Sequence, residues 1–181
     1  MADYKDIVGS TVRSNDGVLT SAKTGELFYD TTNRNFSYRF PNITSAGAWR
    51  TGNNLNSARE QHSGNGSQTS ALATGGLTTT EVAVAESYNG ATWSEGNNLN
   101  AAKRTHASIG NSTTSSIAFG GDSGTGVVAT TESYNGTNFS EVANLNTARK
   151  GITGAGESNT SALAIGGEDA TADVAVVEAW D

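Results

Sequence analysis

One pattern is written three times along this chain, and this repetition constrains the fold more than any local feature does. Each copy opens on an aromatic residue, and the openings are 44 and 46 residues apart. An Asn-Leu-Asn motif, a basic residue, a Gly-Gly pair and a Glu-(Ser/Ala)-aromatic motif follow in the same order each time. A fixed period of this length indicates one supersecondary unit that is repeated. The repeated positions are Trp49, Trp93 and Phe139; Leu55, Leu99 and Leu145; Arg59, Lys103 and Arg149; Gly75, Gly76, Gly120, Gly121, Gly166 and Gly167; Glu86, Glu132 and Glu178; and Tyr88, Tyr134 and Trp180.

Each copy alternates short apolar segments with turn signals, which is typical of antiparallel β-sheet. In the first copy a polar stretch at 61–66 precedes candidate strands at 69–74, 81–88 and 91–95, and Asn89-Gly90 is a strong tight-turn signal. We therefore predict an all-β fold with four short strands per repeat, each repeat forming a blade of a β-propeller. The matching segments of the other copies are 115–119, 127–134 and 137–141, and then 161–165 and 173–180.

The order of these motifs resembles the signature of kelch repeats over residues 49–181. In the first copy the signature reads Gly75-Gly76, Glu86, Tyr88, Trp93 and the Lys103-Arg104 pair. The second copy departs from it by carrying Phe139 in place of the tryptophan. The resemblance implies kelch-like propeller blades in which the glycines let strands approach closely at a turn. It also implies that the Tyr and Trp side chains pack between neighbouring blades and do not stack on a ligand.

The repeats divide the chain into 49–92, 93–138 and 139–181. Three blades are too few for a closed ring, because closed propellers have about four to eight. The first copy opens on its tryptophan strand, whereas the last stops where another Asn-Gly turn and tryptophan strand should follow. We therefore expect a homo-oligomer in which two chains share strands to make six blades, since bare edge strands invite aggregation. A trimer that shares strands, or an open array on a scaffold, is the alternative.

Residues 1–48 lie outside the repeats and are expected to form an anchor built on a β-hairpin. Two aromatic-rich strands at 25–30 and 35–40 flank a turn at 31–34. A lone hairpin is marginally stable in water, so it must pack on something larger. The Gly-Glu-Leu-Phe-Tyr-Asp-Thr-Thr-Asn stretch resembles the short β segments that open tail-fibre and head-decoration proteins of tailed bacteriophages, which join such anchors to Gly/Asn/Thr-rich repeats. The candidate anchor residues are Leu27, Phe28, Tyr29, Phe36, Tyr38 and Phe40.

Composition narrows the possible partners and the compartment. The 181 residues include no cysteine, which excludes disulfides and thiolate metal sites. Residues 1–48 carry five bases and five acids, so the net charge of −7 resides in the repeats, which lack the basic footprint of a nucleic-acid binder. We expect no nucleic-acid partner. No apolar run reaches the roughly 18 residues of a membrane span, and the N-terminus lacks the features of a secretion signal. The protein is expected to be made in a host cytoplasm, without secretion by a signal peptide, and to be located in a virion.

The side chains able to do chemistry recur in ways that favour structural roles. His62 and His106 occupy equivalent positions, but the third copy has Ile152 there, which indicates a packing site and not a metal ligand. The repeated glutamates are expected to pair with the repeated bases, because a single catalytic carboxylate would not be needed three times. The acidic loops at Glu168-Asp169 and Asp122 could hold Ca²⁺ loosely, although a solvated loop is the preferred interpretation. We predict no cofactor, no metal and no enzymatic activity.

These observations together predict a structural component of a phage particle. In this interpretation residues 1–48 bind other virion proteins, and the kelch-like repeats are exposed for particle stabilisation or for adhesion to a host surface. The alternative is a soluble kelch-type module that binds a protein or a glycan. An enzyme on a propeller scaffold is a distant third, because the repeats offer mostly Ser, Thr, Asn and Ala where acids, His or Tyr would have to converge.

Overall fold

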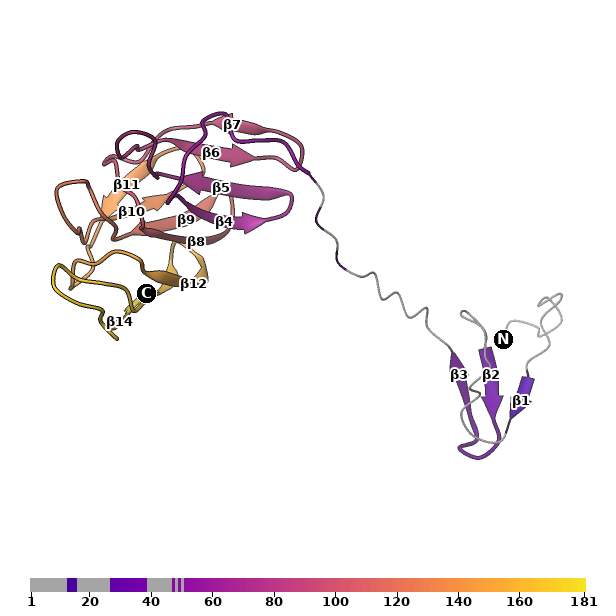
Figure 1. The fold of residues 1–181 in the computed structure, drawn as a ribbon. Coiled ribbons are helices and arrows are strands. Elements are labelled where there is room, and N and C mark those ends of the chain that lie inside the picture. Colours follow the sequence, from indigo (N-terminus) through magenta and orange to yellow (C-terminus); the bar gives the residue numbers. More distant parts are fainter. Residues whose placement is uncertain (1–12, 16–26, 39–46, 48, 50) are drawn as a thin grey trace. The chain divides into compact units, whose positions relative to one another are not determined.

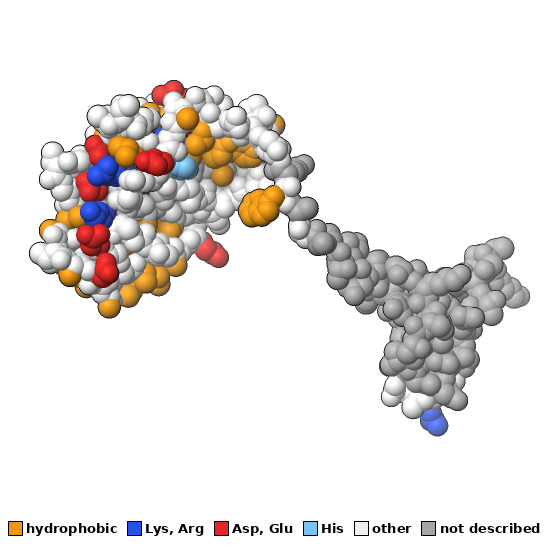
Figure 2. All heavy atoms as spheres, in the orientation of Figure 1, with side chains coloured by type: hydrophobic (Ala, Val, Ile, Leu, Met, Phe, Trp, Pro, Cys, Tyr) orange, Lys and Arg blue, Asp and Glu red, His pale blue; other side chains and the backbone are white. Residues whose placement is uncertain are grey.

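The computed structural model describes residues 13–15, 27–38, 47, 49 and 51–181 (Figure 1). The described part of the chain is all-β and contains no helix, as the sequence predicts. The chain divides into two compact units, Met1–Arg50 and Thr51–Asp181. Charged side chains gather in a row on the second unit, which holds the repeats (Figure 2).

The described part of the first unit is a small sheet with the strand order β1-β2-β3. Strands β2 (Leu27–Asp30) and β3 (Asn35–Tyr38) are antiparallel and are joined by the turn at 31–34, at the place predicted for a hairpin. Strand β1 (Arg13–Asn15) pairs parallel to β2, and the sequence analysis did not predict it. The rings of Tyr29 and Phe36 meet across the hairpin, edge to face, with centroids 5.1 Å apart. Phe40 and the side chains of Leu27, Phe28 and Tyr38 lie outside what the structure describes.

The second unit contains three antiparallel sheets in which neighbouring strands are consecutive in the chain. Sheet 1 consists of β4 (Ser63–Ser67), β5 (Ser70–Thr74), β6 (Ala85–Tyr88) and β7 (Trp93–Glu95). Sheet 2 consists of β8 (Ala107–Ser112), β9 (Ser115–Phe119), β10 (Thr131–Tyr134) and β11 (Phe139–Val142). Sheet 3 consists of β12 (Thr153–Ser158), β13 (Ser161–Ile165) and β14 (Val177–Trp180).

The described residues of sheet 3 form three strands, so β14 is an edge strand, in agreement with a last repeat that stops before its next tryptophan strand. One detail of the strand prediction was wrong. The third strand of each sheet begins four residues later than predicted, at Ala85, Thr131 and Val177. The residues just before these strands bond to the Gly-Gly turn instead: in sheet 1 the N–H of Val82 donates to the Gly76 carbonyl and the N–H of Gly75 to the Val84 carbonyl.

The Gly-Gly turns have backbone conformations that favour glycine. The second glycine of each pair has φ between 106° and 113°. A Cβ atom on Gly121 would lie 2.7 Å from the carbonyl oxygen of Arg104, a contact that real side chains do not make. The turn therefore packs directly on the backbone that follows the repeated base, which fixes the distance between the two segments.

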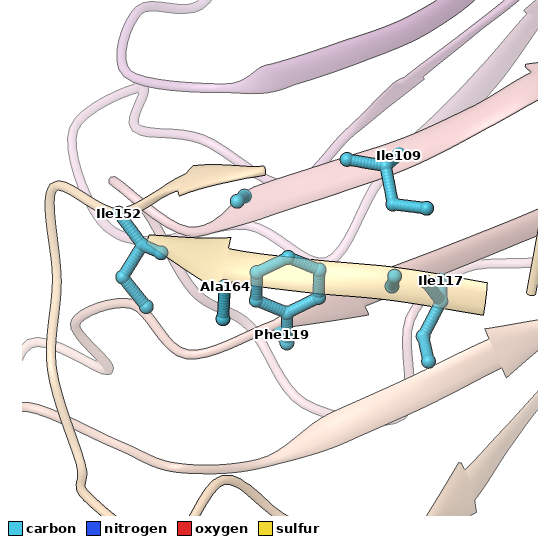
Figure 3. Packing of buried hydrophobic residues seen from close by; sticks show 7 residues of the cluster. Ile109, Ile117, Phe119, Ile152 and Ala164 are labelled. Atoms are coloured by element: carbon cyan, nitrogen blue, oxygen red, sulfur yellow. The ribbon is translucent and has the colours of Figure 1, made fainter. Parts of the chain in front are cut away.

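The sheets are packed one behind the other, with strands β4, β8 and β12 side by side. One apolar cluster joins sheets 1 and 2 and includes Leu72 and Phe139. A second cluster joins sheets 2 and 3, where Ile117 and Phe119 of β9 meet Ala164 of β13 (Figure 3). Ile117 is 1% exposed and Phe119 is 2% exposed, so both side chains are fully removed from water. The strands of one sheet therefore carry large apolar residues on the face toward the next sheet and alanines on the face toward the previous one.

Candidate functional site

The most distinctive group of residues is a buried ion pair that occurs once in each repeat. Glu86 pairs with Arg59, and both side chains are fully buried. Lys103 Nζ lies 3.2 Å from Glu132 Oε1, and Arg149 Nη2 lies 3.0 Å from Glu178 Oε1. The structure therefore brings together, pair by pair, the bases and the glutamates that recur in the sequence. Each pair links the loop before the first strand of a sheet to the third strand of the same sheet.

Backbone groups complete the coordination of each carboxylate. Glu132 Oε2 accepts a 2.6 Å hydrogen bond from the N–H of Asn100, and Glu178 accepts an equivalent 2.6 Å bond from Asn146. Burial alone would raise the pKa of Glu86, but the hydrogen bond from the Asn56 N–H and the neighbouring Arg59 outweigh this and lower it. A carboxylate held in its charged form by such fixed partners is a structural group and is poorly suited to exchange protons with a substrate.

The Asn-Leu-Asn motif bridges two sheets, a role that the sequence analysis missed. In the second copy Asn98 Oδ1 accepts a hydrogen bond from Ala85 N–H at 3.1 Å, and Leu99 N–H donates to the Ala83 carbonyl at 2.9 Å. Both partners belong to the first repeat, whereas the next residue, Asn100, binds Glu132 of sheet 2. The motif thus holds the preceding sheet with its first two residues and its own sheet with the third. We call this arrangement the inter-sheet joint.

The repeated aromatic residues occupy three different environments. The Tyr88 and Trp93 rings pair across β6 and β7 with centroids 5.0 Å apart, and the Tyr134 and Phe139 rings pair at 4.5 Å. Phe139 is buried between sheets 1 and 2, whereas Trp93 is half-buried. Trp49 is fully exposed. The remaining member, Trp180, donates from its indole N–H to the Asn159 carbonyl at 3.0 Å.

The two histidines differ in burial although their sequence positions are equivalent. His106 is 5% exposed, and its Nε2 lies 2.9 Å from Thr74 Oγ1 of sheet 1. Burial lowers the pKa of His106 to about 3, and the charge of Lys103 adds to this effect. His62 is exposed, while Ile152, the third equivalent, is buried in the second apolar cluster. In the described part of the chain, no three His, Cys, Asp or Glu side chains gather as metal ligands would.

The buried neutral His106 predicts a specific acid sensitivity. The unfolded chain binds a proton at this residue near pH 6.5 whereas the folded chain resists it until about pH 3, so stability falls as the pH drops below about 6.5. Between pH 7 and pH 5 the wild type should lose about 2 kcal/mol more unfolding free energy than His106→Gln. Urea denaturation of both proteins at the two pH values measures the difference. Equal losses in the two proteins would contradict a neutral, buried His106.

A row of alternating charges crosses the surface of the three sheets (Figure 2). Arg104 contacts Glu81 at 3.2 Å and Asp122 at 3.6 Å, and Lys150 contacts Asp122 at 3.6 Å and Glu168 at 3.9 Å. A hydrogen bond from the Gly124 N–H lowers the pKa of Asp122, and the positive charges of Arg104 and Lys150 lower it further. Asp122 is therefore engaged by two cations, which leaves it poorly placed to bind Ca²⁺ with Glu168 and Asp169.

Hydroxyl and amide side chains of strands β4, β8 and β9 bond to one another. Ser108 Oγ lies 3.0 Å from both Ser63 Oγ and Asn65 Oδ1, and Ser116 Oγ lies 3.2 Å from the same Asn65 oxygen. These contacts join sheet 1 to sheet 2 through polar groups. Each group has a protein partner, so none is positioned as a free nucleophile.

Comparison with known proteins adds no assignment. No protein-family model matches the sequence. A search of the curated proteins gives no match. In the described residues no helix is long and apolar enough to cross a membrane.

Proposed function

We propose that this protein is a structural component of a virus particle, in which kelch-like propeller blades form an exposed head and residues 1–48 attach to other virion proteins. The observation that carries the structural role is the inter-sheet joint. The Asn-Leu-Asn motif of this joint, the neighbouring ion pair and the Gly-Gly turn all bond to groups within the repeats. Charged and hydrogen-bonding groups that are paired with one another in this way stabilise the fold, and few of them are available to act on a substrate.

The propeller architecture is supported by how the sheets are ordered. Successive sheets place their first strands side by side, and each loop after a fourth strand crosses to the next sheet. Radial repetition of small antiparallel sheets in this manner is the organisation of propeller blades. Fold by itself does not select a function. The virion assignment rests on the resemblance of residues 25–33 to the opening segments of phage fibre and decoration proteins.

The distribution of charge supports different roles for residues 1–48 and residues 49–181. Residues 1–48 are electrically neutral and rich in aromatic residues, whereas residues 49–181 carry the whole net charge of −7. A neutral aromatic segment is suited to packing on another protein, and an acidic surface resists non-specific association. This difference favours attachment through the N-terminal part and exposure of the repeats.

Deleting residues 1–45 tests this proposal. The shortened protein should be soluble and should retain the β-sheet circular-dichroism spectrum, but it should not join particles when it is produced alongside the particle proteins. Particle occupancy is measured by quantitative mass spectrometry of purified particles, with the full chain as the control. Incorporation of the shortened protein at full occupancy would reverse the assignment. A full chain that is never found in particles would favour the soluble binding module instead.

A further inference from the structure

Sheet 3 exposes an apolar surface, whereas the equivalent surfaces of the other two sheets are buried. Leu163 and Ile165 of β13 are 40% and 36% exposed. Their equivalents in sheet 2, Ile117 and Phe119, are 1% and 2% exposed because sheet 3 covers them. Val177 on β14 is 58% exposed. We call this surface, defined by Leu163, Ile165 and Val177, the tail face.

A cavity between sheets 2 and 3 lies where an aromatic ring is found one sheet earlier. The cavity has a volume of about 240 Å³. It is lined by Ile117, Leu145 and Trp180, the repeat equivalents of Leu72, Leu99 and Tyr134, which pack in one cluster with Phe139. Within the described residues sheet 3 has three strands, none of which brings the equivalent ring, so Trp180 has no aromatic partner among these residues. The cavity therefore has room beside Trp180 for one aromatic side chain at the place that Phe139 occupies one sheet earlier.

Sheet 1 has an unfilled hollow on the side that faces away from sheet 2. This hollow is lined by Leu55, Ala73 and Trp93, which correspond to Leu99, Ala118 and Phe139 of the joint between sheets 1 and 2. In that joint the large side chain of the preceding sheet, Leu72, fills the space between them. We call the surface defined by Leu55, Ala73 and Trp93 the head face. It lacks the leucine that the tail face exposes as Leu163.

The head face and the tail face also each carry some of the hydrogen-bonding groups that form an inter-sheet joint. In the third copy Asn144 accepts from the Thr131 N–H and Leu145 donates to the Ala129 carbonyl, both at 3.0 Å. The corresponding residues of the first copy are Asn54 and Leu55, and the structure records no such bonds for them within 51–181. The groups that they would hold correspond, in the third copy, to the Val177 N–H and the Ala175 carbonyl. Sheet 1 thus has the Asn-Leu side of a joint, and sheet 3 has the backbone groups that such a side would bind.

We propose that the tail face of one chain binds the head face of a second copy through a third inter-sheet joint, and that Trp49 of the second copy fills the cavity beside Trp180. Trp49 holds the place in its repeat that Trp93 and Phe139 hold, and it is fully exposed within its own chain. Two copies joined twice in this way contain six sheets, within the range of about four to eight found in closed propellers. The inference rests on the propeller architecture proposed above and adds the residues of the interface.

One position weakens the proposed joint and provides a test of it. Arg104 and Lys150 each contact an acid of the preceding sheet, Glu81 and Asp122. The first copy has Glu60 at this position, and Glu60 would face Glu168 of the other chain. Glu60 pairs with Leu77 through backbone hydrogen bonds, so its side chain can be replaced without removing that bridge. A base at position 60 would restore the attraction found at the other two joints.

The test is the mass of the full chain in solution, measured by sedimentation over a range of concentrations. The wild type should have twice the chain mass of 18.6 kDa. Trp49→Ala and Leu163→Asp should each raise the dissociation constant at least about 30-fold, as expected for side chains at the centre of an interface. Glu60→Lys should lower it about two- to five-fold per joint, and Glu95→Lys, the same charge change on exposed β7, should not. All four side chains are exposed in a single chain, so circular dichroism should show an unchanged fold.

Three outcomes would overturn the proposal. A wild type that stays at 18.6 kDa at all concentrations has no joint between copies. A dimer that tolerates both Trp49→Ala and Leu163→Asp uses another surface. Equal effects of Glu60→Lys and Glu95→Lys would place position 60 outside the interface. The particle-occupancy experiment with residues 1–45 deleted is read separately, so a failure of attachment to particles is not confused with a failure of the joint.

Discussion

Replacing Glu132 with glutamine is expected to lower the unfolding free energy of the repeat unit by about 3–5 kcal/mol. Lys103 and Glu132 are fully buried and their charged atoms lie 3.2 Å apart, so the substitution leaves an ammonium group without its counter-charge. Lys103 would keep only two 3.3 Å hydrogen bonds, both to Thr130. Burial already lowers the pKa of Lys103, which shows how strongly the site disfavours an unpaired charge. Urea denaturation at pH 7 and at one protein concentration measures the loss.

The matched control removes both charges together. Lys103→Met combined with Glu132→Leu should recover most of the loss, because well-packed apolar residues often replace a buried ion pair without a net cost. The coupling between the two positions is then read from the double-mutant cycle. A loss below about 1 kcal/mol for Glu132→Gln would mean that water reaches Lys103 and that the pair is not buried in solution.

The sequence predicts the all-β class and the repeat length because the aromatic, Asn-Leu-Asn, Gly-Gly and turn motifs recur in the same order in each copy. The short apolar segments that end at each Gly-Gly pair place β5, β9 and β13 correctly, and the aromatic runs place β2 and β3. Strand β1 could not be predicted, because Arg-Ser-Asn shows no alternation and its parallel partner lies more than ten residues away. Residues 81–84 alternate like a strand, but the Gly-Gly turn takes their hydrogen bonds, and no local pattern reveals this.

Equivalent residues of the repeat do not have equivalent environments, which is the main limit on reading the site from sequence. His62 and His106 match in position, yet only His106 is covered, because sheet 1 lies against it whereas no sheet within residues 51–181 lies against the outer side of sheet 1. The bridging role of Asn98 is hidden for a related reason. Its partner, Ala85, is 13 residues away, and its neighbour Asn100 bonds to a residue 32 positions ahead. Such contacts follow from the order of the sheets and not from local sequence.

Replacing Phe139 with alanine is the second substitution with a large expected effect. Phe139 is 6% exposed and packs with Leu72, Leu99 and Tyr134 between sheets 1 and 2. Truncation of a buried phenylalanine typically costs about 3–5 kcal/mol, because the cavity left behind collapses only in part. That amount is a large share of the stability of a small domain, so the unfolding midpoint in urea should fall sharply.

Trp93→Ala is the matched comparison, because Trp93 has the same place in the preceding repeat and the same tyrosine neighbour across the strand pair. Trp93 is half-buried and faces no further sheet of residues 51–181, so in a dilute monomer its truncation should cost clearly less than that of Phe139. If two copies form the proposed joint, the tail face of the second copy covers Trp93. The cost of Trp93→Ala should then rise with protein concentration, since association stabilises the folded chain by mass action. A cost for Phe139→Ala no larger than that for Trp93→Ala in dilute monomer would contradict the assignment of the buried joint to sheets 1 and 2.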